Sequence, residues 1–380
     1  MQVGIDITST LFGRGVSRYT SNLVRALANI RELQLSLYGC SLRQQDELEL
    51  IARQLLPDHQ EKIFIEQLPG GIQNIAWNWL SVNPVKKHLP NLQVFHSWDW
   101  IQPPDADLAL VSTIHDLAIL KFPQTAHPQV VKMHSKSWKR LKERDAEIIA
   151  VSHATKKDIV ELLEIPADKI HVVHEALPAE FKKSSDALTE DRHEQLKNKL
   201  HLTRPFILFV GTREPRKNLA RLIEAWLPLK KDLDLIIAGE SGWDTTGDKS
   251  YNSISELRFL GKVTDQELVV LYAEAEALAY PCLYEGFGLP ILESFYLGTP
   301  VITSNVSSML EVAGNAATLV DPMEVESIRA GILTTLNEPL QDQKQRLQRM
   351  IIRLQLFNWQ SVAEETTKVY QTAWRKFSEK

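Results

Sequence analysis

Two glutamates separated by a glycine-rich turn carry the strongest chemical signal in the sequence. Glu285 and Glu293 bound the segment EGFGLPILE, which follows the apolar run 277–282. The apolar run predicts a buried strand, the glycines permit close backbone approach, and Pro290 suits the first turn of a helix. A helix N-terminus attracts anions, and carboxylates accept hydrogen bonds from sugar hydroxyls. The segment therefore predicts a sugar-nucleotide site; the alternative is an ordinary surface loop and helix that carry two glutamates.

A basic turn follows another predicted strand, 205–211, and leads into a helical pattern. Arg213, Arg216 and Lys217 belong to this turn. Cations near a helix N-terminus face the positive end of the helix dipole, so an anionic ligand such as a diphosphate would stabilise them there. Gly239 ends the next predicted strand and also permits close backbone approach. The alternative for the basic turn is a solvated loop with its cations in water.

The first half of the chain offers further candidates at predicted strand ends. Arg14 and Gly15 belong to a loop that suits phosphate but lacks the full glycine spacing of a dinucleotide site. His96 and His115 each lie at the end of a predicted strand, where each is either a ligand for a sugar hydroxyl or structural. Ser152 precedes a helical pattern and predicts an N-cap.

Short β-rich runs alternate with helical patterns throughout, which predicts parallel sheets flanked by helices. The expected strands are 3–7, 33–38, 62–67, 92–96, 109–114, 147–152 and 170–174 in the first half, and 205–211, 235–239, 257–260, 277–280, 301–303 and 317–320 in the second. The fold class is therefore α/β, with two Rossmann-like, doubly wound domains. We expect them to face a central cleft lined by the carboxyl ends of their strands, where such folds bind ligands.

The composition limits the other classes of function. The length of 380 residues favours two domains, and a net charge of -5 gives no reason to expect nucleic acid as a partner. Cys40 and Cys282 lie far apart in the sequence, which argues against a disulfide framework. No metal-ligand spacing, secretory signal or membrane-spanning apolar run is present in the sequence, so we expect a cytoplasmic protein without a metal or cofactor.

Two basic stretches leave a peripheral membrane contact open. The segment 132–144 carries six lysines and arginines together with His134, and Trp77, Trp79, Lys86, Lys87 and His88 lie near a predicted helix. Such faces can dock on anionic lipid headgroups. The alternative is a solvated basic surface over a partly buried core.

In this order, and over nearly the whole chain, these motifs resemble a retaining glycosyltransferase of family 4 with the GT-B fold. The resemblance is to hexosyl- and mannosyltransferases of cell-surface polysaccharide assembly. It implies an acceptor-side domain at 1–180, a linker region at 181–204 and a nucleotide-sugar-binding domain at 205–356. It also implies that a final helix at 357–380 crosses back to the N-terminal domain.

The resemblance also implies roles for individual residues. Arg216 and Lys217 match the pair that holds the donor diphosphate, and Glu293 matches the carboxylate on the donor ribose. Glu285 and His115 match residues beside the transferred sugar and complete the expected catalytic set. The remaining expected donor-binding residues are Gly15, Arg213, Gly239, Phe287, Gly288 and Leu289.

The sequence departs from the family pattern at two places. Thr212 stands where many relatives have arginine, so the phosphate ligand is either Arg213 or Arg216. After the last strand of the first domain, where relatives often have Asn or Gly, this chain has His174, Glu175 and Ala176, which are either cleft-lining or part of a linker.

The implied function is transfer of a hexose from a nucleoside diphosphate sugar to a glycan or lipid-linked acceptor. GDP-mannose is favoured as the donor, with UDP-glucose close behind. One alternative is a nucleotide-sugar-binding subunit without transfer activity of its own. A dinucleotide oxidoreductase is disfavoured because the Gly-x-Gly-x-x-Gly turn is absent from the sequence.

Overall fold

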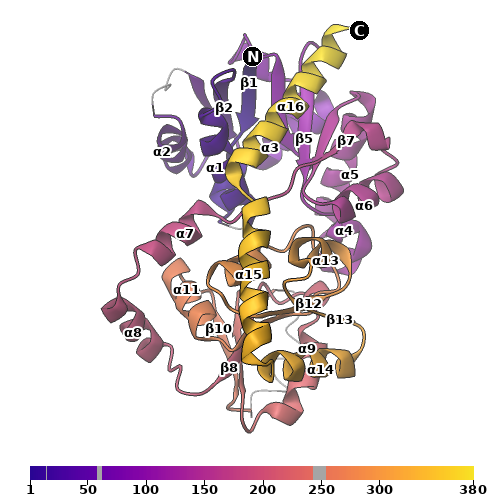
Figure 1. Ribbon diagram of the computed structural model, residues 1–380. Coiled ribbons are helices and arrows are strands. Elements are labelled where there is room, and N and C mark those ends of the chain that lie inside the picture. Colours follow the sequence, from indigo (N-terminus) through magenta and orange to yellow (C-terminus); the bar gives the residue numbers. More distant parts are fainter. Residues whose placement is uncertain (14, 58–61, 243–253) are drawn as a thin grey trace. The chain divides into compact units, whose positions relative to one another are not determined.

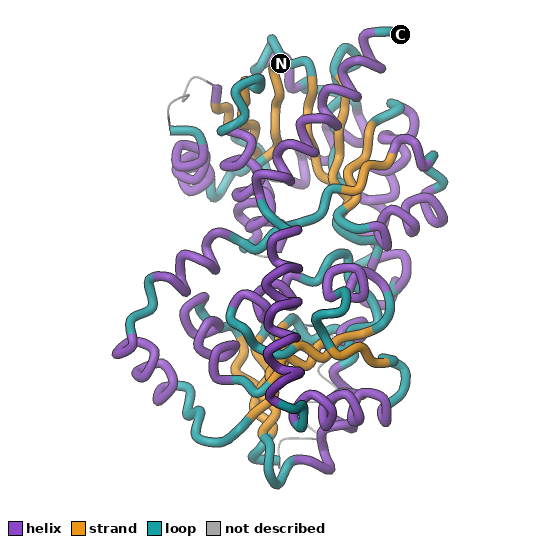
Figure 2. The backbone as a smooth tube through the Cα atoms, viewed as in Figure 1, coloured by secondary structure: helices purple, strands orange, loops and turns teal. Residues whose placement is uncertain are grey.

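The computed structural model describes residues 1–13, 15–57, 62–242 and 254–380, and the chain divides into two compact units. The first unit contains Met1–Glu175 and Trp359–Lys380, and the second contains Ala176–Asn358. In each unit a parallel sheet is flanked by helices, as the ribbon in Figure 1 and the tube coloured by secondary structure in Figure 2 show. The predicted fold class, α/β with two Rossmann-like sheets, is confirmed.

The sheet of the first unit has seven parallel strands in the order β3-β2-β1-β4-β5-β6-β7. Their bounds are β1 (Gln2–Asp6), β2 (Gln34–Cys40), β3 (Ile63–Glu66), β4 (Val94–Trp98), β5 (Ala109–Ile114), β6 (Glu147–Ala150) and β7 (Ile170–Val172). Strands β4, β5 and β6 are buried along their whole length, as expected for central strands of a parallel sheet covered on both faces. The order reverses between β1 and β4, and this is the switch point at which open α/β sheets bind ligands.

The helices of the first unit cover both faces of this sheet. They are α1 (Gly15–Ala28), α2 (Gln45–Leu55), α3 (Gly70–Asn74), α4 (Ala118–Lys121), α5 (Pro128–Glu143), α6 (His153–Leu163) and α16 (Trp359–Ser378). The last helix, α16, packs against α1 and against β4, β5 and β6 (Figure 1).

A buried histidine fixes α16 to the sheet. The Nδ1 of His96 lies 2.7 Å from the Tyr370 hydroxyl of α16, and its Nε2 lies 2.8 Å from the Thr113 hydroxyl of β5. Burial, together with the nearby His115, lowers the pKa of His96 to about 3, so the ring is neutral. Of the two interpretations left open for His96, the structure therefore supports the structural one.

The sheet of the second unit has six parallel strands in the order β10-β9-β8-β11-β12-β13, with its switch point between β8 and β11. Their bounds are β8 (Phe206–Val210), β9 (Asp234–Ala238), β10 (Leu257–Gly261), β11 (Ala277–Tyr280), β12 (Val301–Ser304) and β13 (Thr318–Val320). The helices are α7 (Ala179–Asp186), α8 (Glu190–Lys199), α9 (Leu219–Trp226), α11 (Asp265–Glu274), α12 (Leu289–Tyr296), α13 (Ser307–Ala313), α14 (Val325–Leu336) and α15 (Leu340–Leu356).

Residues 181–204, which we expected to be a linker region, include the helical turns of α7 and α8 in the second unit. Both helices pack against α11. Phe181 of α7 is fully buried, and its ring meets the Tyr272 ring of α11 edge to face at 5.9 Å. Buried aromatic contacts of this kind make α7 part of the second unit's core rather than a free connection.

Candidate active site

The site forms where β8 and β11 end, on either side of the switch point of the second sheet. The turn after β8 supplies Arg216 and Lys217, and the loop after β11 supplies Glu285. These strands are neighbours in the sheet, so their carboxyl ends bring together side chains that lie far apart in the sequence.

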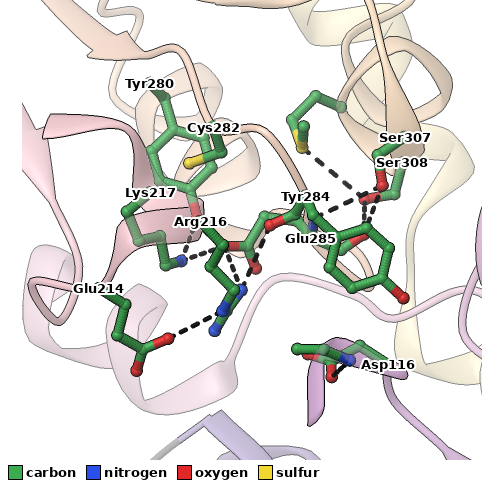
Figure 3. A network of polar contacts seen from close by, with 12 residues as sticks. Asp116, Glu214, Arg216, Lys217, Tyr280, Cys282, Tyr284, Glu285, Ser307 and Ser308 are labelled. Atoms are coloured by element: carbon green, nitrogen blue, oxygen red, sulfur yellow. Dashed lines mark hydrogen bonds and ion pairs between the residues drawn. The ribbon is translucent and has the colours of Figure 1, made fainter. Parts of the chain in front are cut away.

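Both cations converge on one carboxylate oxygen. Nη1 of Arg216 donates to Oε1 of Glu285 at 2.8 Å, and Nζ of Lys217 forms an ion pair with the same oxygen. Figure 3 shows the two basic side chains directed at Glu285. On its other edge, Arg216 donates from Nε to Oε2 of Glu214 at 2.8 Å, and Lys217 donates to the Tyr280 hydroxyl at 2.8 Å. Two cations are thus held in fixed positions by two carboxylates and a phenol.

The electrostatics of the cluster favour the ionised form of Glu285. Burial raises the pKa of Glu285, but the charges and hydrogen bonds of Lys217 and Arg216 outweigh it, so the pKa lies below its ordinary value. Burial raises the pKa of the Cys282 thiol to about 12, although Lys217 lowers it. Glu285 is therefore ionised, and Cys282 remains a neutral thiol that cannot act as a nucleophile near neutral pH.

The backbone around Glu285 is fixed by two serines at the start of α13. The Oγ atoms of Ser307 and Ser308 donate to the Glu285 carbonyl oxygen at 2.8 and 2.9 Å. Gly288 then adopts a φ of 111°, a value that favours glycine, and α12 begins at Leu289. Phe287 is buried with its ring edge to face against Phe357, 5.6 Å away. The loop before α12 therefore has both a hydrogen-bonded and an apolar anchor.

Glu293 lies within α12 and is buried. The Tyr272 hydroxyl of α11 donates to its Oε2 at 2.9 Å. A buried carboxylate is tolerated only when it is hydrogen-bonded. The tyrosine supplies such a bond and also fixes the direction of the carboxylate.

The glycine at position 239 has a local structural explanation. A Cβ built on Gly239 would lie 2.0 Å from the carbonyl oxygen of Gly211, so the ends of β8 and β9 can approach only because this residue is glycine. Arg213 follows Gly211 and places its guanidinium 5.0 Å from the centre of the Phe259 ring. Arg213 thus lies beside Phe259, whereas Arg216 is part of the Glu285 cluster.

In the first unit, the histidine at the end of β5 has an acidic partner. The Nδ1 of His115 lies 2.9 Å from Oε1 of Glu175, and Nε2 has no hydrogen-bond partner in the part of the chain that the structure describes. Burial lowers the pKa of His115, but the hydrogen bond and charge of Glu175, with the charges of Asp99 and Asp116, outweigh it, so the pKa lies above its ordinary value. The pair fixes the orientation of the imidazole and leaves its Nε2 atom buried.

Other predicted positions in the first unit are simple to place. Gly15 begins α1, and a Cβ on it would meet nothing within 4 Å, so sterics alone do not require glycine there. The predicted N-cap is confirmed, because Oγ of Ser152 accepts from the Thr155 N–H at 3.0 Å. Arg14 in the first loop lies outside the described residues.

Comparison with known proteins decides the family. The family models described as "Glycosyltransferase Family 4" and "Glycosyl transferases group 1" match residues 13–181 and 191–352. O-antigen chain mannosyltransferase B of Escherichia coli is 30% identical over 384 residues, which cover 94% of this chain and 96% of that protein. The chain belongs to glycosyltransferase family 4. This glycosyltransferase is also 28% identical to the MMP alpha-(1->4)-mannosyltransferase of Mycolicibacterium hassiacum over 244 residues, which cover 62% of this chain and 56% of the relative.

The fold of this family 4 glycosyltransferase is shared with solved structures. The Anabaena HepE protein, solved in complex with UDP-glucose, superimposes with a TM-score of 0.68 at 14% identity and covers 98% of this chain and 100% of its own. At this identity the likeness concerns the GT-B fold alone.

Several residues around the glycosyltransferase site carry no recognisable sequence signal. Tyr272 is a buried helix residue, and Ser307 and Ser308 lie one strand further along the chain than Glu285. The position of Tyr280 near Lys217 could have been predicted, because Tyr280 is the last residue of β11 and β11 lies beside β8, the strand that precedes Lys217. The sequence places Glu175 just after the last predicted strand of the first unit. The spacing of residues does not indicate that Glu175 contacts His115.

Proposed function

We propose that this glycosyltransferase transfers mannose from GDP-mannose, with retention at the anomeric carbon, to a hydroxyl of a glycan or lipid-linked acceptor. The observation that carries the proposal is the convergence of Arg216 and Lys217 on Glu285 at the switch point of the second sheet.

The donor diphosphate would bind at Arg216 and Lys217. A guanidinium and an ammonium complement two phosphates, and the N-terminus of α12 adds the positive end of a helix dipole. Because carboxylates already hold both cations in place, little side-chain freedom is lost when the diphosphate binds. Such preorganised donors stabilise the charge that develops as the diphosphate leaves, at about 3 kcal/mol each. No metal ion or cofactor enters this proposal.

The proposed reaction is a front-face substitution. The bond from the anomeric carbon to the phosphate oxygen breaks, and its electron pair stays on the diphosphate. The acceptor oxygen bonds to the same face of the sugar, and its proton passes to the departing phosphate. Glu285, ionised and paired with two cations, would orient the sugar and hold the cations without forming a covalent intermediate.

The remaining roles concern one residue in each unit. Glu293, fixed by Tyr272, would accept hydrogen bonds from the donor ribose. His115, whose Nδ1 is bonded to Glu175, stays a predicted catalytic residue of the first unit.

GDP-mannose is preferred because the relative that matches over nearly the whole length is named a mannosyltransferase. UDP-glucose or another UDP-sugar is the second candidate, since a protein of the same fold was solved with UDP-glucose. A third possibility is a binding subunit that holds a nucleotide sugar without transferring it.

A panel of GDP-, UDP- and ADP-sugars tests the donor through ligand-dependent thermal stability, because a ligand that binds only the native state raises the melting temperature. GDP-mannose should stabilise most, and incubation with a soluble hexoside acceptor should release GDP and give a product whose new linkage retains the donor's anomeric configuration by NMR. Binding without release would support the subunit alternative. No stabilisation by any nucleotide sugar, or an inverted linkage, would overturn the proposal.

A further inference from the structure

A short segment of the first unit reverses the usual arrangement of a surface helix. Helix α3 continues into a π-helix, Ile75–Leu80, and the side that faces the protein carries the polar residues Gln73, Asn74 and Asn78 as well as Ala76 and Trp77. Nδ2 of Asn78 donates to the Trp100 carbonyl oxygen at 2.9 Å, and Nε2 of Gln73 donates to the Tyr38 hydroxyl at 2.7 Å. Surface helices normally turn their polar side chains to solvent.

The opposite side of the same segment is apolar. Ile72, Ile75, Trp79 and Leu80, which we call the outward face, have exposed fractions of 52%, 52%, 46% and 64%. The segment 70–82 contains no charged residue. The first unit does not need these side chains for its core, because the inward polar side chains and Trp77 attach the segment to it. An exposed apolar cluster of this kind marks an interaction surface.

Two lysines of α5 border the outward face. Nζ of Lys132 and Nζ of Lys136 lie 5.0 and 5.3 Å from the centre of the Trp79 ring. Arg140 of α5 donates from Nη1 to the Trp77 carbonyl oxygen at 2.6 Å and so holds α5 against this segment. Among the described residues, no ion pair joins Lys132 or Lys136 to a carboxylate.

Other residues of the predicted basic stretches do not belong to this surface. Trp77 is fully buried, Lys86 pairs with Asp107 at 2.5 Å, and the His88 ring stacks on Phe64 at 3.9 Å. Across the described ranges 1–13, 15–57, 62–242 and 254–380, no helix has the length and apolar character to cross a membrane.

We propose that the outward face, with Lys132 and Lys136, docks on the surface of an anionic lipid membrane. Tryptophan, leucine and isoleucine suit the boundary between headgroups and acyl chains, and lysines beside them suit anionic headgroups. The two lysines argue for an anionic surface over a second copy of the chain, because a purely apolar partner would leave their charges without a complement. This inference does not depend on the proposed donor or reaction.

The test is sedimentation of the purified chain with vesicles, without any substrate, so that its outcome is independent of transfer. Vesicles of phosphatidylcholine are compared with vesicles of an equimolar phosphatidylcholine and phosphatidylglycerol mixture. The wild type should bind the mixed vesicles and bind pure phosphatidylcholine much more weakly. Ile75→Glu with Leu80→Glu, and separately Lys132→Glu with Lys136→Glu, should each lower the affinity by roughly tenfold or more.

Two matched control variants keep the test specific. Leu340→Glu with Ile352→Glu changes two exposed apolar residues of α15, and Lys344→Glu with Lys368→Glu makes the same change in charge elsewhere. Both should bind mixed vesicles as the wild type does, and circular dichroism should show that all variants fold. Absence of wild-type binding to mixed vesicles would overturn the proposal. A dimer that Ile75→Glu with Leu80→Glu dissociates, without vesicle binding, would assign the face to a second copy instead.

Discussion

Replacing Glu285 by glutamine should destabilise the protein and make its stability depend on added diphosphate. Lys217 and Arg216 are only 9% and 15% exposed, and Glu285 is the carboxylate that they share. Glu285→Gln keeps the shape but leaves the two cations with Glu214 as their remaining acidic neighbour in the cluster. Removing one partner of a buried ion pair costs about 3 kcal/mol or more. That loss corresponds to a fall in melting temperature of roughly 5–10 °C.

Inorganic pyrophosphate should restore much of this loss. In the wild type, Glu285 competes with an added anion for both cations. In Glu285→Gln the anion can neutralise them without that competition, so pyrophosphate should raise the melting temperature of the variant more than that of the wild type.

The matched control is Glu338→Gln, which removes the carboxylate paired with the buried Arg346 elsewhere in the second unit. Glu338→Gln should also be destabilised, but pyrophosphate should not restore it. Scanning fluorimetry with and without pyrophosphate measures both effects. Equal responses of the two variants, or a Glu285→Gln variant as stable as the wild type, would refute the reasoning.

Three further predictions concern the supporting residues. Glu175→Gln should lower the pKa of His115, seen as an NMR titration midpoint at lower pH; an unmoved midpoint would exclude Glu175 as the cause of the raised value. Tyr272→Phe should raise the donor KM by about tenfold with little change in kcat, because it removes one hydrogen bond to the Glu293 carboxylate; a loss confined to kcat would contradict this role. Burial raises the pKa of Asp6 from 3.8 to about 6, despite its hydrogen bonds from Thr8, so the native state holds that proton more tightly than the unfolded chain. The contribution of Asp6 to stability should therefore fall as pH rises from about 4 to 6, so the stability of the wild type relative to Asp6→Asn should fall over this range and Asp6→Asn should be more stable at pH 8 by about 3 kcal/mol; parallel pH profiles would contradict it.

The sequence predicted those features of the fold that depend on residues close together in the chain. The expected strand at 109–114 is observed as Ala109–Ile114, because a parallel strand buried on both faces is rich in apolar and β-branched residues. Ser152 could be recognised as an N-cap because capping depends on residues only three positions away.

Contacts between distant segments could not be predicted in the same way. The partners Glu175 of His115 and Tyr272 of Glu293 lie 60 and 21 positions away, and nothing local to either pair indicates the contact. The sequence indicated Trp79 and the basic segment 132–144 as a candidate membrane contact. It did not predict the exposure of Ile72, Ile75 and Leu80, because helix periodicity assigns apolar residues to the core.

The most direct test of the donor site is the dissociation constant of GDP, compared with that of guanosine, for the wild type and for Lys217→Ala. Lys199→Ala, which removes another paired lysine of the second unit, serves as the control. We predict that Lys217→Ala weakens GDP binding by roughly tenfold to a hundredfold, as expected for one charged hydrogen bond, and leaves guanosine binding unchanged. Wild-type GDP affinity in Lys217→Ala would contradict the assignment of this cluster to the donor diphosphate.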